Sequence, residues 1–315
     1  REALPKQPNH LESRELLKNL CKLLKKTQRR RRFGPFERLE RFELLERSEE
    51  IGGVTMKLDG QVAIVVGGAR GIGEAIAHMF AQEGASIALV DLEKMKPELD
   101  GVAQKITRKG GKATAIIADC TDDRQVNAMV DETLRRWGKI DILINSAGLR
   151  GPLVPVQEIT EQQWDSVLDV NLKAVFLCCR AVLKVMIKQK SGTIVTTSGT
   201  AGKEGMALRG SLCAAKWGLL GLTQTIAKEA GPHGVRANVI CPGGMDEPDL
   251  RPMYAERAKG LGMEFSELEK SVLELTPLRK YAKHDEVAKA ALFLASSDSS
   301  HTTGESLNVS GGRLM

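Results

Sequence analysis

Short apolar runs alternate with amphipathic stretches from Met56 onward, and this alternation constrains the fold more than any other feature. The runs are continuous and rich in β-branched residues, which is typical of strands buried on both faces. They span residues 62–66, 86–90, 113–118, 140–144, 193–197 and 235–240. Residues 122–137 show the helical counterpart, since Val126, Met129 and Leu134 fall on one face. The pattern predicts an α/β fold, a single domain with a doubly wound parallel sheet of about seven strands.

Residues 1–55 differ from the rest of the chain in charge and pattern. They carry 14 Lys/Arg against 9 Asp/Glu, so they hold most of the net charge of +6. We interpret them as a basic N-terminal extension, helical or disordered, ahead of a domain over 56–315. A leucine stripe followed by Arg29–Arg32 leaves open a role on an anionic membrane or nucleic acid, although nucleic acid is disfavoured for the domain itself. No apolar stretch approaches the ~20 residues of a membrane-spanning helix, so none is expected.

The cysteines give no sign of a metal site. The six cysteines form no C-x-x-C pair and have no histidine at metal-ligand spacing. We therefore expect no metal, and free thiols of this kind favour a reducing, cytoplasmic setting.

Glycines between the first strand and the next helix indicate a phosphate-binding loop. The loop reads GGARGIG over residues 67–73, and glycines there let backbone N–H groups approach a pyrophosphate. Asp91 ends the next strand 18 residues after the loop, where a carboxylate binds both ribose hydroxyls of NAD and repels the 2′-phosphate of NADP. Arg70 argues the other way, because it could pair with that phosphate. We predict a Rossmann-type site for NAD(H) in preference to NADP(H), formed by Gly67, Arg70, Gly71, Ile72, Gly73 and Asp91.

Further motifs follow in a fixed order along the chain. They are Asp119 after the third strand, Asn145-Ser146-Ala147-Gly148 after the fourth, Asn171, Lys216, Pro242-Gly243 after the sixth, and Thr303-Gly304-Glu305. With the glycine loop, this set resembles the short-chain dehydrogenase/reductase family over essentially all of residues 56–315.

The resemblance implies hydride transfer between a nicotinamide cofactor and a small carbonyl or alcohol substrate. It implies that Asn171 holds a water in a proton relay and that Lys216 binds the nicotinamide ribose and lowers the pKa of a tyrosine. It further implies a homodimer or homotetramer, paired through the helices at 171–190 and 211–229. The remaining cofactor contacts implied are Asp119, Cys120, Asn145, Ala147, Gly148, Pro242 and Gly243.

The two groups that the family uses on the substrate oxygen are missing. Counting back from Lys216, the family's tyrosine position holds Leu212 and its serine position holds Gly199. Two further departures concern the cofactor, with Val66 in place of a threonine at the loop and Glu247 near the pyrophosphate. A lost general acid removes roughly 10²–10⁴-fold in rate. The groups that could replace it are Lys216, Cys213, Ser211, Ser198 and Thr200.

Two hypotheses therefore remain open. The chain is either an oxidoreductase with an impaired or atypical proton donor, or a catalytically inactive relative that serves as a nucleotide-binding scaffold, sensor or partner subunit. The segment 246–276 is expected to form an apolar lid over the substrate in either case.

Overall fold

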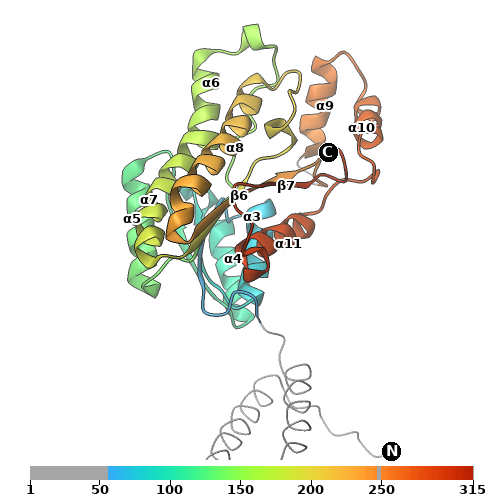
Figure 1. The fold of residues 1–315 in the computed structure, drawn as a ribbon. Coiled ribbons are helices and arrows are strands. Elements are labelled where there is room, and N and C mark those ends of the chain that lie inside the picture. The colour runs from blue at the N-terminus through green and yellow to red at the C-terminus, as the bar shows by residue number, and fades with distance from the viewer. Residues whose placement is uncertain (1–55, 247–249, 315) are drawn as a thin grey trace, which may run out of the picture. The chain divides into compact units, whose positions relative to one another are not determined.

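The computed structural model describes residues 56–246 and 250–314, and residues 56–315 form one compact unit. The described part contains a seven-stranded sheet in the order β3-β2-β1-β4-β5-β6-β7, with every neighbouring pair parallel (Figure 1). The strands are β1 (Val62–Val66), β2 (Ser86–Asp91), β3 (Lys112–Ile117), β4 (Ile142–Asn145), β5 (Gly192–Thr197), β6 (Val235–Pro242) and β7 (Ser306–Val309). The predicted doubly wound fold is confirmed. The order reverses between β1 and β4, where such sheets bind ligands.

Helices cover both faces of the sheet, because side chains along each strand alternate between two cores. Ile64 and Val66 of β1 pack with α5, α7 and α8, whereas Ala63 and Val65 pack with α3, α4 and α11. The helices are α3 (Gly71–Gln82), α4 (Lys96–Arg108), α5 (Asp123–Trp137), α6 (Glu161–Leu168), α7 (Ala174–Gln189), α8 (Gly210–Ala230), α9 (Leu250–Gly260), α10 (Phe265–Glu274) and α11 (His284–Ala295).

The predicted start of β4 was wrong for an identifiable reason. Ile140 is fully buried, as expected, but its N–H and C=O bond to the side chain of Gln189 at 3.1 and 2.8 Å, so β4 begins only at Ile142. The first helix begins at Gly71. Its first turn is therefore formed by the glycine loop itself.

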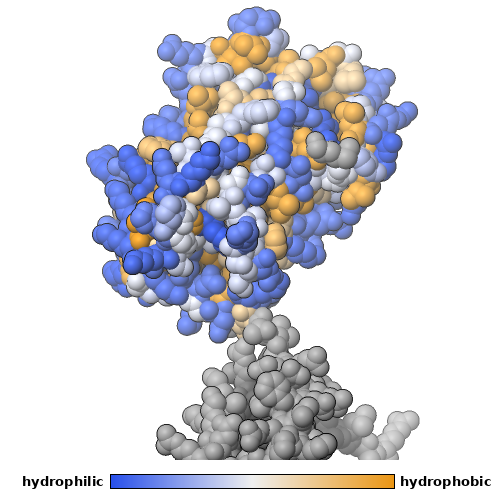
Figure 2. All heavy atoms as spheres, viewed as in Figure 1, coloured by the Kyte–Doolittle hydropathy of each residue, from blue (hydrophilic) through white to orange (hydrophobic). Residues whose placement is uncertain are grey.

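The segment after β6 folds as a small separate layer. Helices α9 and α10 pack on each other through Ala258, Leu268 and Val272 (Figure 1). Apolar surface gathers toward the end of the domain that carries α6, α9 and α10, while the lower part of the same face is mostly hydrophilic (Figure 2). Leu261, which follows α9 in the segment predicted to form an apolar lid, is 38% exposed. The predicted lid is thus helical and only partly apolar.

Some predictions fall outside the described residues. These concern the N-terminal extension over 1–55 and Glu247. Within 56–246 and 250–314, no helix is both long and apolar enough to cross a bilayer. The same residues contain no group of three or more His, Cys, Asp or Glu side chains placed to hold a metal ion.

Candidate active site

A cleft of about 920 Å³ lies at the carboxyl ends of the central strands. It brings together residues from the glycine loop, the end of β2, the segments that follow β3 and β4, the turn between α6 and α7, and α8. Of the predicted site residues, it is lined by Gly67, Arg70, Gly71, Ile72, Gly73, Asp91, Asp119, Cys120, Ala147, Gly148, Asn171, Leu212 and Lys216. Asn145, Gly199, Pro242 and Gly243 do not line it. The amide of Asn145 instead bonds Thr196 Oγ1 at 3.3 Å inside the sheet.

The glycine loop is closed so tightly that side chains are excluded. A Cβ at Gly73 would lie 2.0 Å from the carbonyl oxygen of Gly67, and one at Gly67 would lie 2.6 Å from the backbone nitrogen of Ala147. Gly67 and Gly71 also have φ values of 79° and 61°, in the left-handed region that favours glycine. No described side chain caps the first turn of α3, so its N–H groups are available to an anion. These features fit the pyrophosphate of a dinucleotide.

The substitution Gly73→Ala should disrupt this loop. We expect nucleotide binding to be lost and the free energy of unfolding to fall by several kcal/mol, because the 2.0 Å contact cannot be relieved without moving backbone. Gly101→Ala is the matched control, since this helical glycine in α4 has no atom within 4 Å of an added Cβ. It should stabilise the protein by roughly 0.5–1 kcal/mol. Chemical denaturation and nucleotide titration of both variants check this, and a stable, nucleotide-binding Gly73→Ala protein would contradict it.

Two carboxylates lie at the nucleotide end of the cleft. Asp91 Oδ2 accepts a hydrogen bond from Ala69 N at 3.2 Å, which anchors the carboxylate beside the glycine loop. Asp119 Oδ1 accepts from the N–H and the hydroxyl of Thr121 at 2.9 and 2.7 Å, which leaves Oδ2 unused by these bonds. Both groups line the cleft and suit the hydroxyl and amino donors of an adenosine.

Lys216 is the amine at the other end of the cleft. Its Nζ donates to Thr197 O at 3.0 Å, and burial lowers the pKa of Lys216 to about 8. Leu212 lies one turn earlier on α8 and also lines the cleft. The residue one helical turn before this amine is therefore apolar and has no acidic proton to donate.

Asn171 lies in a π-helical turn, Asp169–Lys173, between α6 and α7. Its Nδ2 donates to Leu149 O and Val167 O at 2.8 and 2.9 Å, and its Oδ1 accepts from Leu149 N at 3.3 Å. These bonds fix the loop after β4 against the π-turn. The side chain thus has a structural function that the sequence did not reveal.

The hydroxyl and thiol groups near α8 are directed elsewhere. Ser198 Oγ donates to Lys216 O at 3.1 Å, and Cys213 Sγ lies 3.8 Å from Glu204 O. Ser211 is buried, with 2% of its surface exposed. Gly199 has φ 140°, so a serine there would be strained although an added Cβ has space. None of these residues lines the cleft.

Sequence reasoning missed three side chains that do not line the cleft but lie near its lining residue Arg150. Arg209 immediately precedes α8, and Tyr254 and Arg257 come from α9. Arg209 donates to the carbonyl of Arg150, which lines the cleft, at 3.1 Å. The sequence offered no spacing signal, because α9 is separated from Arg209 by about 40 residues and a strand.

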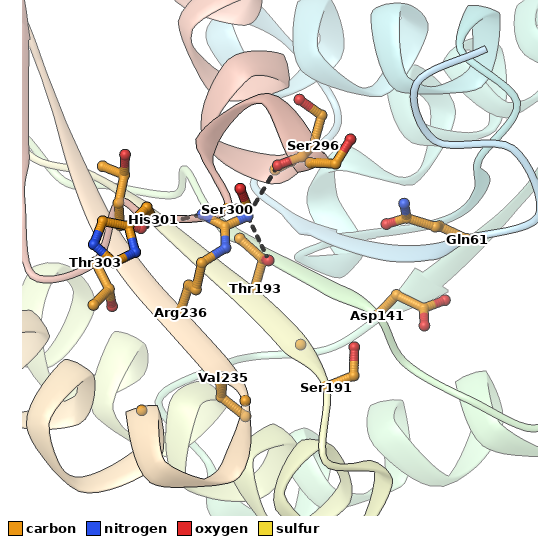
Figure 3. A pocket seen from close by; sticks show the side chains of 16 residues that line it. Gln61, Asp141, Ser191, Thr193, Val235, Arg236, Ser296, Ser300, His301 and Thr303 are labelled. Atoms are coloured by element: carbon orange, nitrogen blue, oxygen red, sulfur yellow. Dashed lines mark hydrogen bonds between the residues drawn. The ribbon is translucent and has the colours of Figure 1, made fainter. Parts of the chain in front are cut away.

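A second pocket, of about 700 Å³, lies at the amino ends of β5 and β6 (Figure 3). Arg236 dominates it, and its guanidinium donates to Thr193 Oγ1, Ser296 O, Ser299 Oγ and Thr302 O at 2.9–3.2 Å. Its donors are therefore used to join the sheet to the turn after α11. Ligands of parallel sheets bind at the carboxyl ends, so this pocket is structural.

Comparison with known proteins agrees with this geometry. Residues 67–313 match the family described as enoyl-(acyl carrier protein) reductase. The chain is 35% identical over 260 residues to 3-oxoacyl-(acyl-carrier-protein) reductase FabG of Thermotoga maritima, covering 82% of this chain and 100% of that protein. The chain belongs to the short-chain dehydrogenase/reductase family.

Other members of the family are similarly close. Levodione reductase of Leifsonia aquatica is 33% identical over 263 residues, covering 82% of this chain and 96% of that protein. The crystal structure of an NAD⁺-bound xylitol dehydrogenase matches with a TM-score of 0.78 at 32% identity, covering 81% of this chain and 100% of that chain. The chain thus has the fold of an oxidoreductase family that binds a nicotinamide cofactor.

Proposed function

We propose that this chain is an NAD(H)-binding member of the family whose carbonyl/alcohol chemistry is impaired or atypical. One observation carries the proposal: a single cleft contains the glycine loop, Asp91 and Lys216, with Leu212 one turn before the lysine. The nucleotide half has the groups that a dinucleotide needs. The substrate half has an amine but no tyrosine at the position where the family's acid is expected.

Asp91 supports NAD(H) over NADP(H). The carboxylate is anchored beside the glycine loop, where it suits two ribose hydroxyls and disfavours a phosphate. The NAD⁺-bound relative adds support. Arg70, which also lines the cleft, is the residue that would work against this preference.

The nicotinamide, when bound, supplies or accepts a hydride. The protein must then provide a proton for the developing alkoxide and charge stabilisation around it. Leu212 can do neither, and Ser198 is used by the backbone of α8. Lys216 Nζ lies on the cleft wall one helical turn after Leu212 and can hold a proton there.

Residual carbonyl reduction should therefore fall as the pH rises through about 8, because the pKa of Lys216 is lowered to about 8 and only its ammonium form can donate. Rates measured from about pH 6 to 10 on the wild type and on Lys216→Arg check this. The guanidinium of the variant is not deprotonated in a protein and cannot donate a proton, so its rate should be low and independent of pH across the range. Measurable wild-type turnover with a flat profile would exclude Lys216 as the donor.

The second candidate function is a non-catalytic nucleotide-binding scaffold, sensor or partner subunit. Both N–H donors of the Asn171 amide are used in local hydrogen bonds, which favours it, since only the remaining lone pair of Oδ1 could hold a relay water. NADH binding without turnover of any carbonyl would support this candidate. NADH-dependent reduction would support the first.

We further propose a homodimer or homotetramer paired through α7 and α8. The aromatic side chains Phe176 and Trp217 on these helices are 43% and 50% exposed, which is costly in a monomer. The five described cysteines are free and buried, which supports a reducing, cytoplasmic setting.

A further inference from the structure

Two arginines near Arg150, a lining residue of the cleft, lack an ion-pair partner within the described residues; Arg209 is buried and Arg257 is partly buried. Arg209 is 5% exposed, and its Nη1 and Nη2 lie against Arg150 O at 3.1 Å and Met253 Sδ at 2.7 Å. The Nε atoms of Arg209 and Arg257 are both buried without an acceptor. Within residues 56–246 and 250–314, neither arginine forms an ion pair.

This arrangement is electrostatically unfavourable without an anion. Burial, and then the charge of Arg257, lower the pKa of Arg209, yet a guanidinium remains protonated at neutral pH. Glu204, the nearby acid, acts on Arg257 through its charge but forms its ion pair with Arg313, at 2.5 Å. Buried charges in proteins are normally paired, so the buried guanidinium of Arg209, with the partly buried one of Arg257 near it, points to a ligand that supplies the counter-charge.

The position of the pair relates it to the cleft. Arg209 immediately precedes α8, and its Nη1 donates to the carbonyl of Arg150, which lines the same cleft as Leu212. The chain enters α8 through Leu208 with φ 65°, a conformation unusual for leucine that fixes the direction of Arg209. Arg257 and Tyr254 lie on α9, so the segment predicted as the lid would contribute the second arginine of this site.

We propose that Arg209 and Arg257 bind a carboxylate carried by the substrate, a few bonds from the carbonyl that faces Leu212 and Lys216. A carboxylate matches the paired N–H donors of a guanidinium, and one placed between two of them satisfies both orphaned Nε groups. The substrate class is then a short oxo acid. This inference rests on the proposed function, because it assigns the substrate of the same cleft.

The test is calorimetric titration of the full chain with levulinate and with its neutral methyl ester, with and without NADH. We expect levulinate to bind about 10- to 100-fold more tightly than the ester, because the hydrogen bonds are charge-assisted. Arg209→Gln and Arg257→Gln should each remove most of this preference. Arg124→Gln is the charge-matched control, since its side chain on α5 is 92% exposed, and it should retain the preference.

Folding and nucleotide binding are measured on the same samples. Removal of an unpaired buried cation should leave the thermal unfolding midpoint of Arg209→Gln at or above that of the wild type. The inference would be overturned if the wild type bound levulinate and the ester equally, or bound neither. It would also be overturned if Arg209→Gln and Arg257→Gln both kept the full preference for levulinate over the ester. Tighter binding of inorganic phosphate than of levulinate would overturn the carboxylate assignment. Loss of NADH binding alone would count against the proposed function and not against this site.

Discussion

The substitution Leu212→Tyr should raise the rate of NADH-dependent carbonyl reduction by about 10²–10⁴-fold. The new hydroxyl would lie one helical turn before Lys216, on the wall of the cleft. An ammonium at that distance favours the phenolate and so brings the pKa of the tyrosine closer to neutrality. Steady-state NADH oxidation against a fixed panel of ketones and oxo acids checks this.

Leu212→Phe is the matched control, since it adds the ring without the proton. It should give no gain in rate, and a gain equal to that of Leu212→Tyr would show that ring shape, not acid catalysis, limits the wild type. No gain from tyrosine would contradict the view that the site is disabled at this residue. Gly199 is left unchanged in this design, because φ 140° would strain a serine by about 1–3 kcal/mol.

The substitution Asp91→Asn should weaken NADH binding by about tenfold or more and narrow its advantage over NADPH. The carboxylate is expected to accept two charge-assisted hydrogen bonds, each contributing about 1.5–3 kcal/mol, and to repel a 2′-phosphate. Titration of the variant with both nucleotides measures the two effects separately.

Asp100→Asn serves as the control for charge. Its carboxylate lies on α4 and pairs with Lys96 at 2.5 Å at the surface, so nucleotide affinity should not change. An unchanged NADH affinity in Asp91→Asn would exclude Asp91 as the ribose ligand.

The fold was predictable because its determinants are local. The strands are buried on both faces, so apolar runs marked them directly, and β1 was predicted to the residue. The glycine loop was equally clear, since only glycine fits where a Cβ would meet backbone at 2.0 Å. The start of β4 was misplaced because Ile140 is buried without belonging to the strand. Its backbone N–H and C=O bond to the side chain of Gln189, 49 residues away.

The substrate side of the site was less predictable because it depends on tertiary contacts. Arg209 resembled an ordinary surface cation in the sequence, and only the packing of α9 over it shows that it is buried. Asn171 was assigned a relay water, whereas its amide bonds to Leu149 and Val167. Partners of polar side chains come from distant segments, and periodicity carries no information about them.

The central claim is that this cleft binds NAD(H) although the family's proton donor is replaced by Leu212. Calorimetric titration of the full chain with NADH and with NADPH tests it most directly. The account predicts saturable NADH binding at least about tenfold tighter than NADPH binding, because Asp91 repels the additional phosphate. Binding of neither nucleotide, or tighter binding of NADPH, would contradict it.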